Sequence, residues 1–261
     1  MDTTSGAPYR VPWTPRDVGI GILLFIAAFV IIPIPFVVPF AFGDTESRPA
    51  LITATVAGVA VYTALIAIIY RMTVVKYGGD LLTHLGIRRP QWSTLGWAAI
   101  AFIGALAVGA AYSGIIGLFD LGALRQGCDD QIPQSIRGDA VVLAITSVVV
   151  VLVAPPVEEA FLRGFVFPGL LRPWGVVAAV VISGSVFGAA HLLGNPLLYK
   201  SLIPFALIGM IFALAYWKSG NLLSSILAHF VFNLMGVIAI AATTCDTTAA
   251  ATIFRPWGFA P

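Results

Sequence analysis

Long apolar segments separated by short polar stretches most strongly limit how this chain can fold. A helix needs about 20 mostly apolar residues to cross the hydrocarbon core of a bilayer. Seven segments reach or approach that length: 18–42, 51–70, 95–119, 140–171, 176–197, 201–217 and 221–244. Only 10% of the residues are charged and 59% are hydrophobic, more apolar surface than a soluble core could cover. We therefore expect an all-α, polytopic transmembrane helix bundle with seven to eight helices.

Prolines should interrupt two of these segments. Pro33, Pro35 and Pro39 should kink or break the second half of the first segment, and an eighth pass would follow if that half re-entered the membrane. Pro155 and Pro156 interrupt the fourth segment, which is unusually long. The first segment is longer than the roughly 7–15 apolar residues of a signal peptide, so we interpret it as the first span.

Basic residues favour a cytoplasmic N-terminus and an extracytoplasmic C-terminus in the cell membrane. In that orientation the inner segments hold eight basic residues: Arg10, Arg16, Arg71, Lys76, Arg88, Arg89, Arg172 and Lys218. The outer segments hold five: Arg48, Arg125, Arg137, Lys200 and Arg255. The formal net charge of +2 and the absence of a basic cluster give no reason to expect a nucleic-acid partner.

The two cysteines, Cys128 and Cys245, should both lie on the extracytoplasmic face. That compartment is oxidising, so they could form a disulfide; the alternative is two unpaired thiols.

Two glutamates follow the proline pair inside the fourth apolar segment. Placing an ionisable group in a bilayer costs at least about 2.5–3.5 kcal/mol, so such groups need a reason to be there. Pro155 and Pro156 should break the incoming helix and begin a new one, with Glu158 and Glu159 near its N-terminus. Glu159 and Arg163 have the spacing of a helical ion pair, which is a structural role. Glu158 points about 100° away and remains available for chemistry, the alternative being a capping carboxylate.

Two further pairs of residues lie one helical turn apart in later segments. Phe187 and His191 share a face, with small residues between them, and His229 and Asn233 share another. A lone membrane histidine or asparagine can simply bond across a helix interface, but a stacked His and Asn is harder to explain that way. Counted from the polar flanks of their segments, Glu158, His191 and His229 lie about 21, 24 and 16 Å along their helices. All three should therefore lie inside the membrane at overlapping depths.

These side chains suit hydrolysis. Glu158 can take a proton from water, and His191 can share that work. His229 and Asn233 can donate hydrogen bonds to an oxyanion. Alternatively, Glu158, His191 and His229 could bind one Zn²⁺ with an open position for water, although no HExxH motif supports this version.

Three motifs occur in order on successive apolar segments: Glu158-Glu159-x-x-x-Arg163, Phe187-x-x-x-His191 and His229-x-x-x-Asn233. Together they resemble the three motifs of the CPBP (CAAX protease and bacteriocin-processing, or Abi) family of intramembrane endopeptidases, which includes the type II CAAX prenyl endopeptidases. The resemblance covers roughly residues 140–240. We expect these residues to form the catalytic core of a single integral membrane domain, 1–261.

The resemblance implies an intramembrane cavity open to the cytosol and to lipid, and a membrane-associated protein or peptide, in some members lipidated, as the substrate. It implies that Glu158 activates water with His191, and that His229 and Asn233 stabilise the oxyanion. Glu159 with Arg163 would brace this site. The family has been described both as metalloproteases and as metal-independent glutamate proteases; the second version is favoured because the residues suffice without an ion.

Two other classes of function fit the same residues. Buried Glu and His side chains and a proline-interrupted helix also occur in proton- or ion-coupled transporters, although no matching interrupted segment occurs in the first half of the chain. A non-catalytic immunity or scaffold protein would keep the polar residues as contacts between helices.

Overall fold

A computed structural model describes residues 10–41, 43–124, 134–194 and 196–242. The regular structure of these residues is entirely helical, as predicted. Six helical stretches among them are long and apolar enough to cross a membrane: Pro15–Phe40, Arg48–Val75, Trp92–Leu118, Ala140–Leu193, Tyr199–Ser219 and Leu223–Ala242. The chain is therefore a multi-pass membrane protein.

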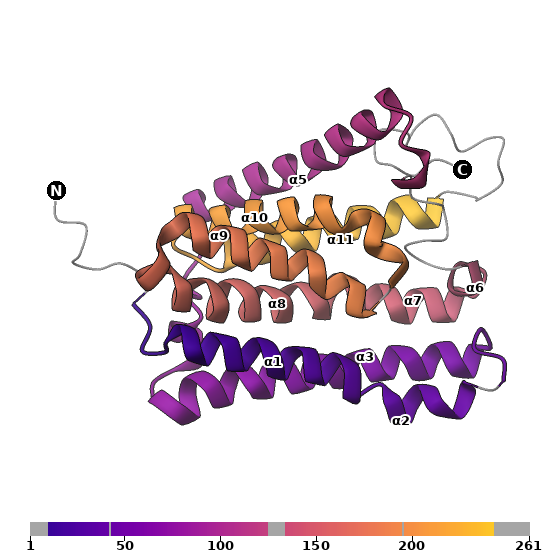
Figure 1. Ribbon diagram of the computed structural model, residues 1–261, viewed down its shortest axis with the longest axis horizontal. Helices are drawn as coiled ribbons and strands as arrows, with labels where there is room; N and C mark the ends of the chain where they lie inside the picture. Colours follow the sequence, from indigo (N-terminus) through magenta and orange to yellow (C-terminus); the bar gives the residue numbers. More distant parts are fainter. Residues whose placement is uncertain (1–9, 42, 125–133, 195, 243–261) are drawn as a thin grey trace.

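The fourth stretch makes two passes. Its 54 residues would extend about 81 Å as one helix, far more than the hydrocarbon thickness of about 30 Å. The chain reverses at Gly175, where φ is +76°, a conformation that glycine adopts without strain. Figure 1 shows α9 (Phe167–Gly194) folded back alongside α8 (Ala154–Glu159). The six stretches thus give the seven passes that the sequence predicted.

The first stretch breaks where the sequence predicted it would. α1 (Pro15–Ile31) ends before Pro33, and α2 (Ile34–Val37) and the 3₁₀ turn η1 (Val38–Phe40) follow it. These two pieces have four and three residues, too few to cross the membrane on their own. The segment therefore adds one pass.

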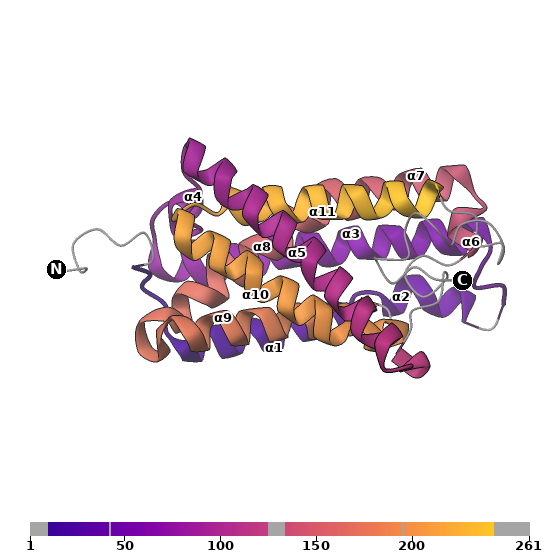
Figure 2. The same cartoon turned by 90° about the horizontal axis from the view of Figure 1, so that it is seen from above.

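The ends of the helices alternate between the two ends of the bundle (Figure 1). α1, α5 (Trp92–Leu118) and α11 (Leu223–Ala242) begin at one end, where α3 (Arg48–Tyr70) and α10 (Leu202–Ser219) finish. Figure 2 shows α5 crossing obliquely over α10 and α11. This arrangement brings together the polar segments that we expect to be cytoplasmic.

Polar side chains hold the connecting segments in place at both ends of the bundle. At the first end, buried Asp17 accepts hydrogen bonds from Lys76 and from the Tyr77 hydroxyl. At the opposite end, Asp139 caps α7 (Ala140–Val148) and pairs with Arg48 at the start of α3. The hydrogen bond from Arg48, with those from two backbone amides, lowers the pKa of Asp139, so this carboxylate stays charged near neutral pH.

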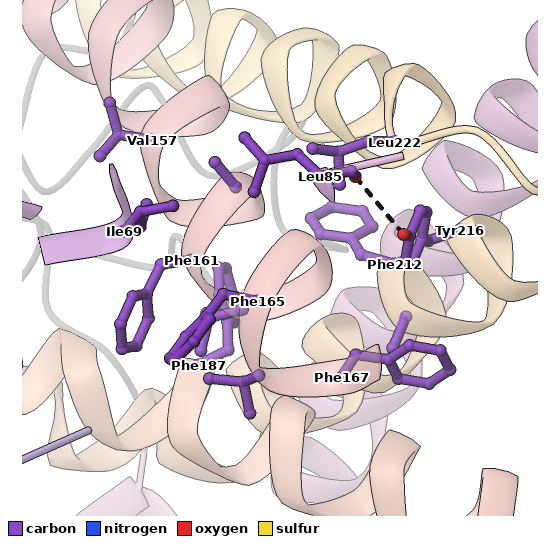
Figure 3. Packing of buried hydrophobic residues seen from close by; sticks show 14 of the residues in the cluster. Ile69, Leu85, Val157, Phe161, Phe165, Phe167, Phe187, Phe212, Tyr216 and Leu222 are labelled. Carbon is purple, nitrogen blue, oxygen red and sulfur yellow. Dashed lines mark hydrogen bonds between the residues drawn. The ribbon is translucent and has the colours of Figure 1, made fainter. Parts of the chain in front are cut away.

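An aromatic cluster fills the core between α1, α10 and the π-helical turn η5 (Ala160–Val166). Phe161, Phe165 and Phe167 are fully buried, and Phe161 stacks on Phe25 with ring centroids 4.8 Å apart. Figure 3 shows Phe161 and Phe165 close together, while Phe167 lies apart from them, against Tyr216 of α10. The core therefore surrounds the segment that directly follows the two glutamates.

Glycines let α9 and α10 pack in close backbone contact. A Cβ atom on Gly188 would lie 2.7 Å from the Leu202 carbonyl oxygen and 2.8 Å from the Ala206 nitrogen. Gly184, four residues earlier, faces Ala206 and Met210 in the same way. This is the small-xxx-small contact of membrane helices. It sets the distance between α9, which carries His191, and α10, whose Gly209 carbonyl accepts a hydrogen bond from Arg163.

Gly188→Val should lower the stability of the bundle, by about 1–3 kcal/mol or more, because backbone atoms of α10 cannot move aside for the added methyl groups. The measurement is thermal unfolding in detergent. Gly114→Val is the matched control, since Gly114 lies in α5 with open space around the position of a Cβ atom. Equal melting temperatures for the two variants would contradict the close contact.

Candidate active site

The helix that carries the two glutamates is continuous, although the sequence predicted a break at Pro155 and Pro156. α8 begins at Ala154 with both prolines in its first turn, as predicted, but Val153 before it is helical (φ −98°, ψ −47°). The two prolines have no amide hydrogen to donate, and the helix widens on both sides of them. The π-helical turns η4 (Val149–Val153) and η5 flank α8. The predicted break was therefore wrong. Such widened turns often mark functional sites.

Asn233 compensates for the irregular backbone of η4. The Ala154 amide donates to the Val149 carbonyl, and Pro155 has no amide hydrogen, so the Val150 carbonyl is left without its usual helical donor. The Asn233 Nδ2 atom donates to this carbonyl oxygen at 2.9 Å. Asn233 thus forms a hydrogen bond between α11 and η4, as polar side chains commonly do between membrane helices. A carboxamide has a second N–H, which this bond leaves for other use.

Glu159 and Arg163 form the ion pair that their spacing predicted. Both side chains are fully buried, and Arg163 Nη1 donates to Glu159 Oε1 at 2.8 Å. Arg163 Nη2 donates to the Gly209 carbonyl of α10 at 2.6 Å. The same Glu159 oxygen lies 3.1 Å from His229 Nδ1. This network ties α8, α10 and α11 together and neutralises the arginine charge inside the membrane.

Phe187 links the charged network to both histidines. Its ring lies 4.9 Å from the Arg163 guanidinium carbon and contacts His191 and His229 edge-on, with ring centroids 4.7 and 5.3 Å apart. Such cation–π and edge contacts hold the planes of the rings in place. These contacts suit Phe187 to a supporting role beside the histidines, which stays a prediction.

Glu158 is placed differently from its neighbour. Its Oε1 atom accepts a hydrogen bond from the Tyr62 hydroxyl at 2.8 Å, and its Oε2 atom lies 3.9 Å from His229 Nε2. The Glu158 side chain is 16% exposed, whereas that of Glu159 is fully buried. One imidazole, that of His229, thus lies between a glutamate held in an ion pair and one that reaches an accessible surface.

His191 is half-buried and presents a single free ring nitrogen. Its Nδ1 donates to the Phe187 carbonyl at 2.8 Å, and its ring packs on Phe205 with centroids 4.4 Å apart. With Nδ1–H donated to the backbone, Nε2 can act as a base. The hydrogen bonds found among the described residues do not join His191 directly to Glu158, and the Phe187 ring lies against both His191 and His229.

The geometry of the described residues gives the zinc version of the site no support. Among the described residues, no three His, Cys, Asp or Glu side chains are grouped so that they could bind one metal ion. Glu158, His191 and His229 therefore do not form a set of three ligands. Cys128 and Cys245 lie outside the described residues, so their predicted disulfide stays a prediction, as does the intramembrane cavity.

One comparison with known proteins gave a match. Residues 140–235 match the model of a family described as Rce1-like, type II CAAX prenyl endopeptidase. This segment, called the Rce1-like segment below, covers less than half of the chain and is similar to that family. The resemblance predicted from the three motifs is confirmed, and the Rce1-like segment contains every predicted site residue from Glu158 to Asn233. No curated protein and no solved structure matched the chain. The matched family is one of proteases, and the apolar helices indicate a multi-pass membrane protein.

Tyr62 is the contact that the sequence analysis missed. It lies in α3, outside the Rce1-like segment, 96 residues before Glu158. Membrane tyrosines gather at the two interfaces, so a tyrosine near the middle of a span was a signal that could have identified it.

Proposed function

We propose that the protein hydrolyses a peptide bond in a membrane-associated protein or peptide, with Glu158, His191, His229 and Asn233 as the catalytic residues. One observation carries the proposal: His229 lies between the buried, ion-paired Glu159 and the partly exposed Glu158. Two adjacent carboxylates thus have different surroundings, a common arrangement where one has a structural role and the other a chemical one. The Rce1-like match favours hydrolysis over the transporter and scaffold alternatives.

The reaction needs a base and a group that stabilises the oxyanion. Glu158, with His191 Nε2, takes a proton from water while the water oxygen attacks the peptide carbonyl carbon. The same proton later passes to the leaving amine. His229 donates Nδ1–H to Glu159, so its Nε2 donates to the oxyanion only when the ring is doubly protonated, a positive charge that the oxyanion itself balances. The second N–H of Asn233 is the other donor.

The test is cleavage of a library of membrane peptides by purified protein in nanodiscs containing ¹⁸O-labelled water. For the wild type we expect cleaved peptides with one ¹⁸O atom in the new carboxylate. For Glu158→Ala we expect no cleaved peptides. Equal cleavage by both proteins would refute the assigned site. Uptake of ions or solutes into liposomes without any cleavage would favour the transporter.

We also propose that the N-terminus is cytoplasmic and the C-terminus extracytoplasmic. The support is the excess of basic residues in the segments gathered at the end where α1 begins. Reporter domains fused to either terminus should show this: alkaline phosphatase should be active at the C-terminus and inactive at the N-terminus. The reverse pattern would contradict the orientation.

A further inference from the structure

Tyr62 makes a polar contact with Glu158 that the proposed mechanism has not used. The Tyr62 hydroxyl donates to Glu158 Oε1 at 2.8 Å, and its ring packs against the hydrophobic core as a half-buried side chain. The donor is on α3 and the acceptor on α8, so the bond forms only when these two helices are packed together. A carboxylate accepts a stronger hydrogen bond than a neutral group does.

This bond determines which oxygen of Glu158 is free. Oε1 is occupied by the tyrosine hydroxyl, so Oε2, the oxygen that lies 3.9 Å from His229 Nε2, remains to receive a proton. Without Tyr62 the side chain could rotate about its flexible bonds, because Glu158 lacks the arginine partner that holds Glu159 in place. A displacement of about 1 Å at a reacting group can reduce the rate about a hundredfold.

A purely structural role is the alternative. Helices α3 and α7 already share a polar contact, since the hydroxyls of Thr55 and Thr146 are 3.4 Å apart. A tyrosine that only joined helices could equally donate to a backbone carbonyl, as Tyr112 donates to that of Lys200. Tyr62 instead binds the partly exposed carboxylate, which is the group that the chemistry requires.

We propose that Tyr62 is a positioning residue that orients the Glu158 carboxylate for proton transfer. The proposal rests on the proposed function, and it adds to the site a residue from outside the Rce1-like segment. Tyr62 acts through Glu158 and does not itself contact the reacting atoms.

The test compares Tyr62→Phe with Tyr112→Phe, because each removes one tyrosine hydroxyl that donates between distant parts of the chain. For Tyr62→Phe we expect kcat to fall about 10- to 100-fold with KM changed less than about twofold. Tyr112→Phe should keep the wild-type kcat.

If Tyr62→Phe does not fold, Tyr62→Leu replaces it. Leucine also removes the hydroxyl, so the same fall in kcat is expected. A wild-type kcat for either Tyr62 variant would overturn the positioning role while leaving the proposed function in place. A lower melting temperature with an unchanged kcat would show that Tyr62 is only structural and would also overturn it. Absence of cleavage by the wild type would refute the proposed function, and this role with it.

Discussion

Glu158→Gln is expected to reduce kcat/KM by about 10²- to 10⁴-fold, the usual contribution of general acid–base catalysis, while the protein keeps its fold. Glutamine has the same shape and can still accept the Tyr62 hydrogen bond through its carbonyl oxygen, but it cannot take a proton from water. Glu158 is outside the buried ion pair, so the stability of the bundle should change little.

The measurement is peptide cleavage in nanodiscs, beside thermal unfolding of the same preparations. Glu46→Gln is the matched control, because Glu46 is an exposed glutamate in the segment between η1 and α3. It undergoes the same chemical change away from the site and should keep wild-type activity. Cleavage by Glu158→Gln at the rate of Glu46→Gln would exclude Glu158 as the base.

Arg163→Leu should destabilise the protein by about 3–5 kcal/mol, since breaking a buried pair leaves an uncompensated charge. Glu159 would remain fully buried without the guanidinium, and the Gly209 carbonyl would lose its donor. His229 would then be bonded to an unpaired carboxylate. We therefore expect activity and stability to fall together, in contrast to Glu158→Gln.

Arg48→Leu is the control, because Arg48 pairs with Asp139 but its side chain is 60% exposed, and such pairs contribute about 0–1 kcal/mol. The double variant Glu159→Gln with Arg163→Leu should recover part of the lost stability, because it removes the buried charge and keeps an acceptor for His229. Thermal unfolding in detergent compares the four proteins. Equal melting temperatures for Arg163→Leu and Arg48→Leu would show that the pair is not required for the fold.

Interactions within one helix were predictable from the sequence. Apolar length predicted the seven passes, and Pro33 predicted the break after α1. The Glu159–Arg163 pair followed from four-residue spacing, because one helical turn fixes that distance whatever surrounds it. The resemblance to the family followed from the order of the motifs and is confirmed over residues 140–235. The catalytic roles of its residues stay predictions.

Contacts between helices were decided by the tertiary structure. Spacing along the chain does not determine how one helix is rotated and shifted against another. The acceptor of Arg163 on Gly209, the donor to Glu158 on Tyr62 and the acceptor of Asn233 on Val150 all depend on that packing. The continuous helix through Pro155 has the same cause. Widened turns and a side chain from α11 compensate there for hydrogen bonds that proline cannot make, so a break predicted from local rules does not occur.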